Sequence, residues 1–382
     1  MEMRLNTLPW MTEEITMLRD AARDFIEGEL APHLEDWRER GYAGAAVWRK
    51  MGELGMLLPE LPEKYGGAGG HYGHQFVLQE EQARAEVPPN TSVHAIAAHY
   101  ILDLGTEAQK EQFLPRMATG ELLGSIVMTE PGCGSDLQAI RTRAVRDGDA
   151  YVINGAKTFI TSGGTTNLLM LAAKTDPDAG ARGISMFAVE TDGVEGYRVG
   201  RLLDKVGMKA SDTAELYFDD MRVPADCLLG GIEGKGFANM MEQLPFERLM
   251  IATGAQAVAE RALELTIAHT KEREAFGGTL FDLQNTRFIL ADCATTVHVS
   301  RTFLNDCIQR LLDGRLDPAA AYMTKLWCTD QQFRVLDECV QLFGGYGYMR
   351  EYPIARMWAD ARVGRVYGGS NEIMKELIAR AL

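Results

Sequence analysis

Long apolar runs are absent from this sequence of 382 residues. No uninterrupted stretch approaches the roughly 20 residues that a membrane-spanning helix requires. The first residues, MEMRLNTLPWMTEEITMLRD, contain no apolar segment of signal-peptide length. We therefore expect a cytoplasmic protein without membrane insertion.

Basic residues and paired cysteines are also scarce. The chain has 39 Lys and Arg against 54 Asp and Glu, a net charge of −15. A nucleic-acid partner is disfavoured, because neutralising phosphates requires a basic surface. The six cysteines form no CxxC pair and share no spacing with histidines, which argues against a metal site. Scattered cysteines in a chain of this length fit a reducing compartment.

Three segments of different periodicity follow one another along the chain. Residues 11–122 have apolar residues at helical spacing, with an expected break at Pro88 and Pro89. From Gly124 the pattern alternates, with expected strands near 167–175, 183–191 and 214–223, and Asp147-Gly148 predicts a hairpin. Helical spacing returns at Gly234. Segregated helices and strands predict an α+β fold, with a helical domain at 1–123, a central β domain at 124–233 and a second helical domain at 234–382.

One long helix is expected early in the third segment. Leu244, Ile251, Val258 and Leu265 recur every seven residues. This spacing predicts an apolar stripe that is buried against other helices.

Three glycine-containing strings stand out. In 126-IVMTEPGCGSD-136, backbone-permissive residues alternate with hydroxyls and acids, a composition that suits either a ligand-binding loop or a simple turn into a strand. The string 341-QLFGGYGYMREYPIARMWAD-360 is compatible with a glycine-capped helix end. In 271-KEREAFGGTLFDLQ-284, Arg273 and Phe276 lie one helical turn apart ahead of two glycines.

Taken together, these strings resemble the acyl-CoA dehydrogenase family along essentially the whole chain. The first string departs from the family pattern only at Val127 and Cys133, where smaller residues are more usual, and the second matches its pattern from Gln341 to Asp360. The resemblance implies the acyl-CoA dehydrogenase fold, with a central β-barrel-like domain between a helical domain and a C-terminal four-helix bundle.

The resemblance also implies FAD as the cofactor and acyl-CoA as the substrate. The implied substrate-binding residues are Ser135, Arg248, Gly368 and Gly369. The implied FAD-binding residues are Ile126, Val127, Met128, Thr129, Gly134, Ser135, Phe159, Ile160, Thr161, Arg273, Phe276, Gln284, Gln341, Leu342, Phe343, Gly344, Gly345, Ser370, Asn371 and Glu372. Arg273, Phe276, Gln284 and 341–345 would reach the FAD of a neighbouring subunit, so a homo-oligomer is implied, most often a tetramer arranged as a dimer of dimers.

The catalytic base is the point on which this sequence departs from many members. Removing the α-proton of the thioester requires a carboxylate, which many relatives carry where this chain has Gly368. A subset that includes long-chain and isovaleryl-CoA dehydrogenases carries it on a helix of the C-terminal domain, the position of Glu247 here. We predict Glu247 as the base and the Gly368 N–H as a donor to the thioester oxygen. The alternative for Glu247 is a surface carboxylate paired one helical turn away.

The expected reaction is the α,β-dehydrogenation of an acyl-CoA to the trans-2-enoyl-CoA, with electrons passed to an electron-transfer flavoprotein. Gly368 and the Pro88-Pro89 break favour a medium-to-long or branched acyl chain over butyryl-CoA, because both leave room near the acyl group. An acyl-CoA oxidase and a non-catalytic subunit that keeps the flavin fold are the alternatives.

Overall fold

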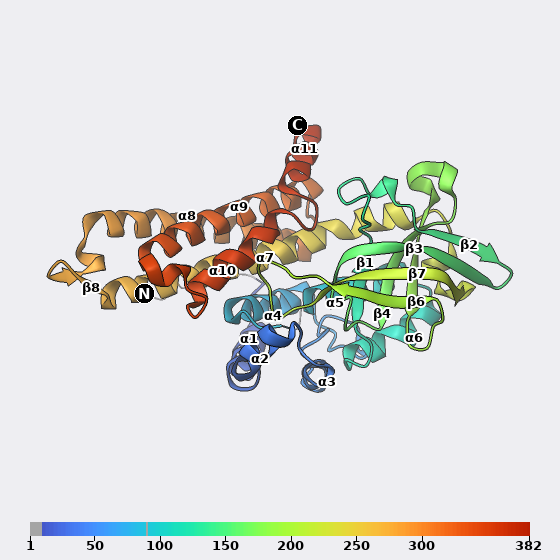
Figure 1. The fold of residues 1–382 in the computed structure, drawn as a ribbon, viewed down its shortest axis with the longest axis horizontal. Coiled ribbons are helices and arrows are strands. Elements are labelled where there is room, and N and C mark those ends of the chain that lie inside the picture. Colours follow the sequence, from blue (N-terminus) through green and yellow to red (C-terminus); the bar gives the residue numbers. More distant parts are fainter. Residues whose placement is uncertain (1–9, 89–90) are drawn as a thin grey trace.

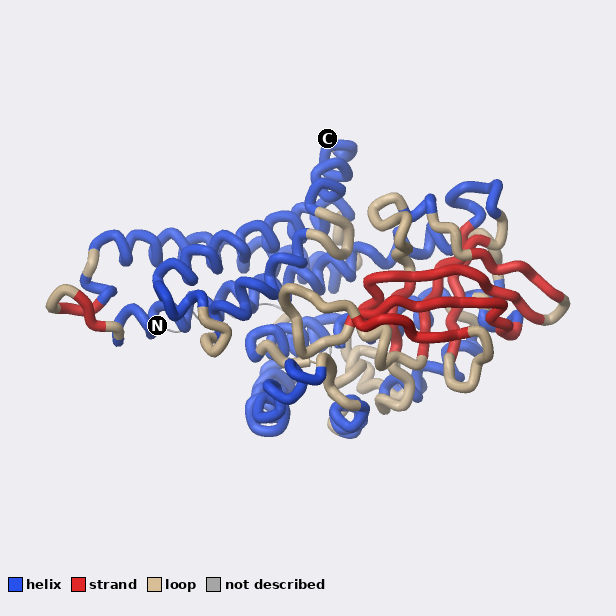
Figure 2. The backbone as a smooth tube through the Cα atoms, in the orientation of Figure 1, coloured by secondary structure: helices blue, strands red, loops and turns tan. Residues whose placement is uncertain are grey.

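The computed structural model describes residues 10–88 and 91–382. The seven-stranded sheet lies at one end of the molecule, a short strand pair lies at the other, and helices fill most of the space between (Figure 2). The chain passes from helices to strands and back to helices, in the order predicted from the periodicity. Within the described ranges, no helix is both long enough and apolar enough to cross a bilayer.

The first group of helices packs beneath the middle of the molecule (Figure 1). Its members are α1 (Glu13–Phe25), α2 (Leu34–Arg40), α3 (Ala45–Glu53), α4 (Tyr72–Ala85), α5 (Thr91–Leu104) and α6 (Glu107–Ala118). α4 ends at Glu86, which adopts a left-handed conformation with φ of 57°, two residues before Pro88. The break therefore lies where the prolines predict it, although Pro89 is outside the described residues.

The central segment forms a seven-stranded sheet. Its strands are β1 (Gly124–Val127), β2 (Arg143–Asp147), β3 (Ala150–Thr161), β4 (Leu168–Lys174), β5 (Ile184–Glu190), β6 (Tyr197–Leu202) and β7 (Thr213–Pro224). The predicted hairpin is present, because β2 and β3 pair antiparallel with Asp147 opposite Ala150 and Gly148 supplies a positive φ of 64°. The backbone N–H of Gly124 donates to His94 Nδ1 of α5 at 3.1 Å, which ties the start of the sheet to the first helices.

The last segment is dominated by long helices. Its elements are α7 (Gly236–Glu272), β8 (Glu274–Ala275), β9 (Gly278–Thr279), α8 (Gln284–Leu312), α9 (Pro318–Phe343), α10 (Pro353–Ala361) and α11 (Asn371–Ala381). At 37 residues, α7 is about 55 Å long. It runs from the sheet to the β8–β9 hairpin at the far end of the molecule (Figure 1).

The prediction that the heptad stripe on α7 is buried is wrong. Leu244, Ile251, Val258 and Leu265 are only half-buried. The buried face is instead rich in small side chains, such as Ala252, Ala255, Ala259 and Ala262. Small residues let neighbouring helices approach closely, so the large apolar residues of the stripe lie at the margin of these contacts.

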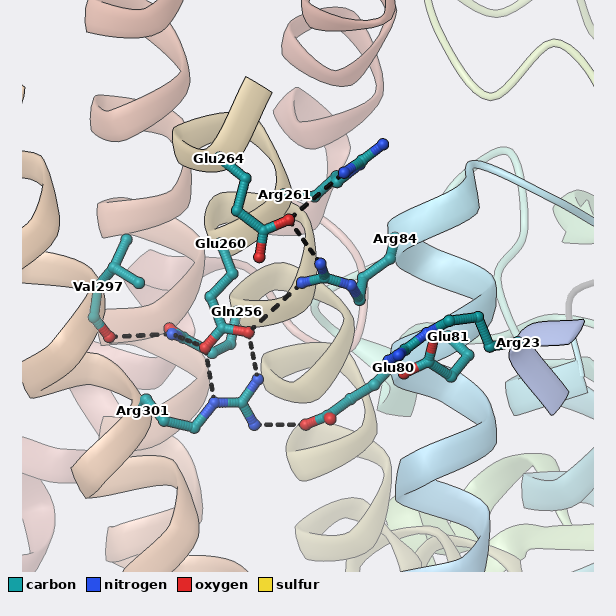
Figure 3. Close-up of polar contacts among 10 residues, drawn as sticks. All are labelled: Arg23, Glu80, Glu81, Arg84, Gln256, Glu260, Arg261, Glu264, Val297 and Arg301. Carbon is teal, nitrogen blue, oxygen red and sulfur yellow. Dashed lines mark hydrogen bonds and ion pairs between the residues drawn. The ribbon is translucent and has the colours of Figure 1, made fainter. Parts of the chain in front are cut away.

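An ionic cluster fixes α7 against α4 and α8 (Figure 3). Arg301 of α8 is buried and binds Glu260 of α7 through two hydrogen bonds of 2.7 and 2.9 Å, and it also pairs with Glu80 of α4. Arg84 of α4 reaches Glu264 of α7 at 2.6 Å. Glu260 lies 13 positions after Glu247 on the same helix, about 20 Å along its axis. The cluster therefore holds in place the helix that carries the predicted base.

Candidate active site

The carboxylate of Glu247 lies inside the molecule, where α7 passes α5. Its residue is only 8% exposed, and its Oε1 accepts a hydrogen bond of 3.2 Å from the Tyr100 hydroxyl. No other hydrogen-bond donor reaches this carboxylate from the part of the chain that the structure describes. Burial raises the pKa of Glu247 to about 7, against the opposing effects of Tyr100 and the Arg248 charge. The alternative of a surface carboxylate does not fit this burial.

Arg248, the next residue, faces the loop that precedes α11. It is 3% exposed, and its guanidinium lies 4.5 Å from the ring centroid of Tyr322 on α9, a cation–π arrangement. Its Nε donates a long hydrogen bond of 3.5 Å to the carbonyl oxygen of Gly368. The predicted base and the predicted glycine loop therefore lie side by side.

Both glycines of this loop have a backbone conformation and surroundings that disfavour a side chain. Gly368 and Gly369 have φ values of 63° and 84°, in the left-handed region that glycine tolerates without strain. A Cβ at Gly368 would overlap Cδ1 of Ile251, and one at Gly369 would lie 2.8 Å from Cε of Met374. Ile251 is one helical turn after Glu247 on α7, so its side chain occupies the space in which a residue 368 side chain would begin.

A buried lysine holds the same loop from the other side. Lys325 of α9 is fully buried and its Nζ donates 2.8 Å hydrogen bonds to the carbonyl of Gly369 and to Oδ1 of Asn371. Burial, with the nearby Arg248 adding to it, lowers the pKa of Lys325 to about 8. Ser370 caps α11, its hydroxyl accepting from the N–H of Ile373 at 3.4 Å. The loop conformation is thus set by partners on two helices.

The predicted flavin loop and the predicted segment 159–161 are neighbours at the edge of the sheet. The N–H of Thr158 donates to the carbonyl of Thr129 at 3.0 Å, and the Ser125 hydroxyl donates to the carbonyl of Thr161 at 2.6 Å. These bonds join the end of β1 to β3. They place Ile126, Val127, Met128 and Thr129 beside Phe159, Ile160 and Thr161.

Glu130 braces the inside of the flavin loop. Its carboxylate accepts from the N–H groups of Arg141 at 2.6 Å and Thr142 at 3.0 Å, and from Lys157 Nζ at 2.9 Å. Lys157 also donates to the carbonyl of Met128 at 2.8 Å. Burial opposes the charged form, but the Lys157 charge and these donors outweigh it, so the pKa of Glu130 lies below its usual value.

The outer surface of this loop fits a flat apolar ring. Phe159 is 67% exposed and has a positive φ of 58°, a costly conformation for an aromatic residue that packs against nothing. Gly134 and Ser135 of the flavin loop are also exposed, and a Cβ at Gly132 would have nothing within 4 Å. These residues are suited to hold the isoalloxazine ring of the expected FAD.

A second set of predicted cofactor residues lies at the opposite end of the molecule. Arg273, Phe276 and Gln284 are on or next to the β8–β9 hairpin, which Figure 1 shows far from β1 and β3. Phe276 is 94% exposed, and Arg273 lies 5.6 Å from the ring of Tyr346, just beyond the predicted segment that comprises Gln341, Leu342, Phe343, Gly344 and Gly345. Within one chain, these residues therefore lie near one another but far from the flavin loop.

Sequence reasoning missed three polar groups that shape the site. Tyr100, Lys325 and Lys157 are all fully buried. The only sequence signal for the two lysines is a charged residue inside an apolar pattern, and Tyr100 has none. In the described ranges, no group of three or more His, Cys, Asp or Glu side chains is placed to hold a metal ion.

Comparison with known proteins covers nearly the whole chain. Family models for the N-terminal, middle and C-terminal domains of acyl-CoA dehydrogenase match residues 12–121, 125–221 and 234–382. The long-chain specific acyl-CoA dehydrogenase of Mus musculus mitochondria is 45% identical over 375 residues, 97% of this chain and 87% of that protein.

Solved structures are similar over the same extent. The crystal structure of an acyl-CoA dehydrogenase from Geobacillus kaustophilus has a TM-score of 0.95 and 45% identity, covering 98% of this chain and 99% of that one. A glutaryl-CoA dehydrogenase from Mycobacterium smegmatis, solved in complex with FADH2, has a TM-score of 0.91 and 29% identity, covering 98% and 96%.

Proposed function

This chain belongs to the acyl-CoA dehydrogenase family of FAD-dependent oxidoreductases, and on that premise we propose that Glu247 is the base of its α,β-dehydrogenation reaction. The observation that carries the proposal is the burial of Glu247 beside Arg248 and the Gly368 loop, with a pKa raised to about 7. A base whose pKa lies near the working pH is both ionised often enough and basic enough to take a proton.

Different residues of the chain carry out proton transfer and substrate binding. Glu247 receives the α-proton of the acyl thioester, and the N–H of Gly368 donates to the thioester oxygen, where enolate charge develops. Arg248, Gly369 and Ser135 bind the acyl-CoA. Bound FAD supplies the acceptor for the hydride that leaves the β-carbon.

Two sets of residues would hold the FAD. The ring would rest on the flavin loop and Phe159, and the first turn of α11, at Ser370, Asn371 and Glu372, would face the cofactor. The remaining predicted residues lie at the β8–β9 end, where Phe276 is exposed. We therefore propose a homo-oligomer, a tetramer built as a dimer of dimers, in which this end of one subunit completes the cofactor site of another. The domains are assigned to 1–123, 124–233 and 234–382.

The proposed substrate is a medium-to-long or branched acyl-CoA, and the proposed electron acceptor is an electron-transfer flavoprotein. The helix break before Pro88 supports the substrate, whereas the space expected beside Gly368 is taken by Cδ1 of Ile251. The similarity to a long-chain specific enzyme agrees with the proposed substrate.

Anaerobic mixing with palmitoyl-CoA tests the assignment of the base. We expect wild-type flavin to be bleached faster by palmitoyl-CoA than by butyryl-CoA. Glu247→Gln should keep its FAD but bleach about 10²- to 10⁴-fold more slowly, the usual contribution of a general base. Glu242→Gln is the matched control, because Glu242 is an exposed residue of the same helix and should bleach normally. Near-normal bleaching of Glu247→Gln would contradict the proposal.

A further inference from the structure

The hydrogen bond between Tyr100 and Glu247 joins two helices that are far apart in the chain. Tyr100 lies on α5 and is fully buried, and its hydroxyl donates to Oε1 of Glu247 at 3.2 Å. It is the only hydrogen bond that the described residues make to this carboxylate. A buried carboxylate with a single donor is unusual, because burial favours complete pairing.

The hydrogen bond from Tyr100 reaches only one of the two carboxylate oxygens of Glu247. A phenol facing a carboxylate donates one proton and engages one oxygen, here Oε1. Burial, with the Glu247 charge and hydrogen bond adding to it, raises the pKa of Tyr100 well above its usual value. Tyr100 therefore stays protonated, and remains a donor, at every pH at which the enzyme works.

We propose that Tyr100 is a positioning residue that holds Glu247 by Oε1, so that Oε2 is the oxygen that takes the substrate's α-proton. This role rests on Glu247 being the base. As the bond from the α-carbon to its hydrogen breaks, the proton forms an O–H bond at Oε2 and the electron pair stays on the acyl group. Bound FAD would supply the acceptor for the hydride of the β-carbon. Tyr100 keeps its own proton throughout, so the step balances without any further reactant.

The other titratable groups around Glu247 do not duplicate this bond. Arg248 follows it on α7 but points to Gly368, and Lys325 of α9 is bonded to Gly369 and Asn371. His99 of α5 is paired with Glu60 at 3.1 Å. Tyr72 of α4 contacts the ring of Phe246, at 4.6 Å between centroids, and Tyr322 of α9 lies under Arg248.

Removing the Tyr100 hydroxyl should therefore change the proton affinity of the base. The donated bond favours the carboxylate form, so its loss raises the pKa of Glu247. Because the base acts when deprotonated, the acidic limb of the pH profile moves to higher pH. A hydrogen bond to a charged group corresponds to a pKa change of about 1 to 2.

The experiment compares Tyr100→Phe with wild type in anaerobic flavin reduction by palmitoyl-CoA from pH 5.5 to 9.5. We expect the kinetic pKa to rise by about 1 to 2, with a rate loss of about 10-fold at pH 7 that shrinks at high pH. Tyr151→Phe is the matched control, because Tyr151 is also buried and donates to a carboxylate, Glu233, at 2.5 Å, in the β domain. Its profile should match that of wild type.

A second variant should shift the kinetic pKa in the opposite direction while keeping the hydroxyl. A 3-fluorotyrosine at position 100 is a stronger donor, so the kinetic pKa should fall. Infrared titration of the holoenzyme provides a readout without turnover, because the protonated carboxyl band that disappears in Glu247→Gln reports the same pKa. A kinetic pKa equal to that of wild type in both Tyr100 variants would overturn the positioning role. Normal bleaching by Glu247→Gln would instead overturn the assignment of the base, so the two failures are distinguishable.

Discussion

Two buried glutamates near the proposed site, Glu130 and Glu247, have pKa values shifted in opposite directions. Glu130 in the flavin loop is 7% exposed and Glu247 on α7 is 8% exposed. Glu130 accepts from two backbone N–H groups and an ammonium, and its pKa lies below the usual value. Glu247 accepts from one neutral hydroxyl, and burial raises its pKa to about 7. Similar solvent exposure thus accompanies a fixed anion in one place and a proton acceptor in the other.

The two residues differ in depth and in their donors, because Glu247 lies deeper in the protein and has fewer, uncharged donors. Several hydrogen-bond donors and a cation stabilise the charged form of a carboxylate. Such a carboxylate does not take up a proton near neutral pH, and it serves as a structural brace. A carboxylate with one donor keeps a free oxygen and a pKa near neutrality. Changing the donors of either residue should therefore move it towards the behaviour of the other.

The largest effect is expected from taking the cation away from Glu130. Lys157→Met leaves a buried carboxylate without its partner, which costs about 3–5 kcal/mol. We expect the flavin loop to loosen, so that the purified variant retains far less FAD than wild type, measured by the ratio of flavin to protein absorbance.

The double variant Lys157→Met with Glu130→Gln provides the control. Neutralising the glutamate removes the unpaired charge, so part of the FAD content should return. If the single variant binds FAD as wild type does, Glu130 is not a brace of the flavin loop.

The second prediction is that Glu247 and Glu130 make the stability of the protein depend on pH in opposite ways. The pKa of folded Glu247 is about 7, above its unfolded value of about 4.5. Unfolding therefore releases its proton between these values, and the stability of the protein falls by about 3 kcal/mol as pH rises from 4.5 to 7. Glu130 behaves in the opposite way, because its lowered pKa makes a stabilising contribution that is present above 4.5 and is lost as pH falls.

Urea denaturation of the holoenzyme at pH 5 and pH 8 measures this pair. Relative to wild type, Glu247→Gln should gain stability at pH 8 and little at pH 5. Glu130→Gln should lose stability at both pH values, because the contribution of Glu130 is lost only as pH falls below about 4.5. An equal change at pH 5 and pH 8 in Glu247→Gln would show that the pKa of Glu247 is not raised.

Much of the fold could be predicted from the sequence, because period and turn chemistry are local properties. The hairpin at Asp147-Gly148 depends only on nearby residues, and it is present. The heptad stripe on α7 was predicted incorrectly, because spacing identifies an apolar face but not how closely a neighbouring helix can approach it. That distance depends on the alanines of the buried face.

The candidate site was predictable only where a motif specified it. The flavin loop and Glu247 came from resemblance, and no pattern pointed to Tyr100. The contact between Tyr100 and Glu247 spans 147 positions in the chain, and it exists only because α5 and α7 cross there. A partner that changes a pKa from so far away in the sequence can be identified only from the folded structure.

The smallest effect concerns whether the base can be moved back to residue 368. Glu247→Gly should abolish flavin reduction, and adding Gly368→Glu should restore some of it, with a preference for shorter acyl chains. Recovery should be poor, because residue 368 has a φ of 63°, which costs a non-glycine residue about 1–2 kcal/mol, and its Cβ would meet Ile251.

Ile251→Ala should relieve the second of these obstacles. The Ile251 side chain ends in Cδ1, the atom that a Cβ at residue 368 would overlap. We therefore expect the triple variant to reduce its flavin about 10-fold faster than the double variant, equivalent to about 1.4 kcal/mol of barrier. Ile251→Ala in the wild-type background is the control and should not accelerate the reaction. A triple variant no faster than the double would mean that Ile251 is not what excludes a side chain at residue 368, and that the left-handed backbone of the loop alone keeps the base on α7.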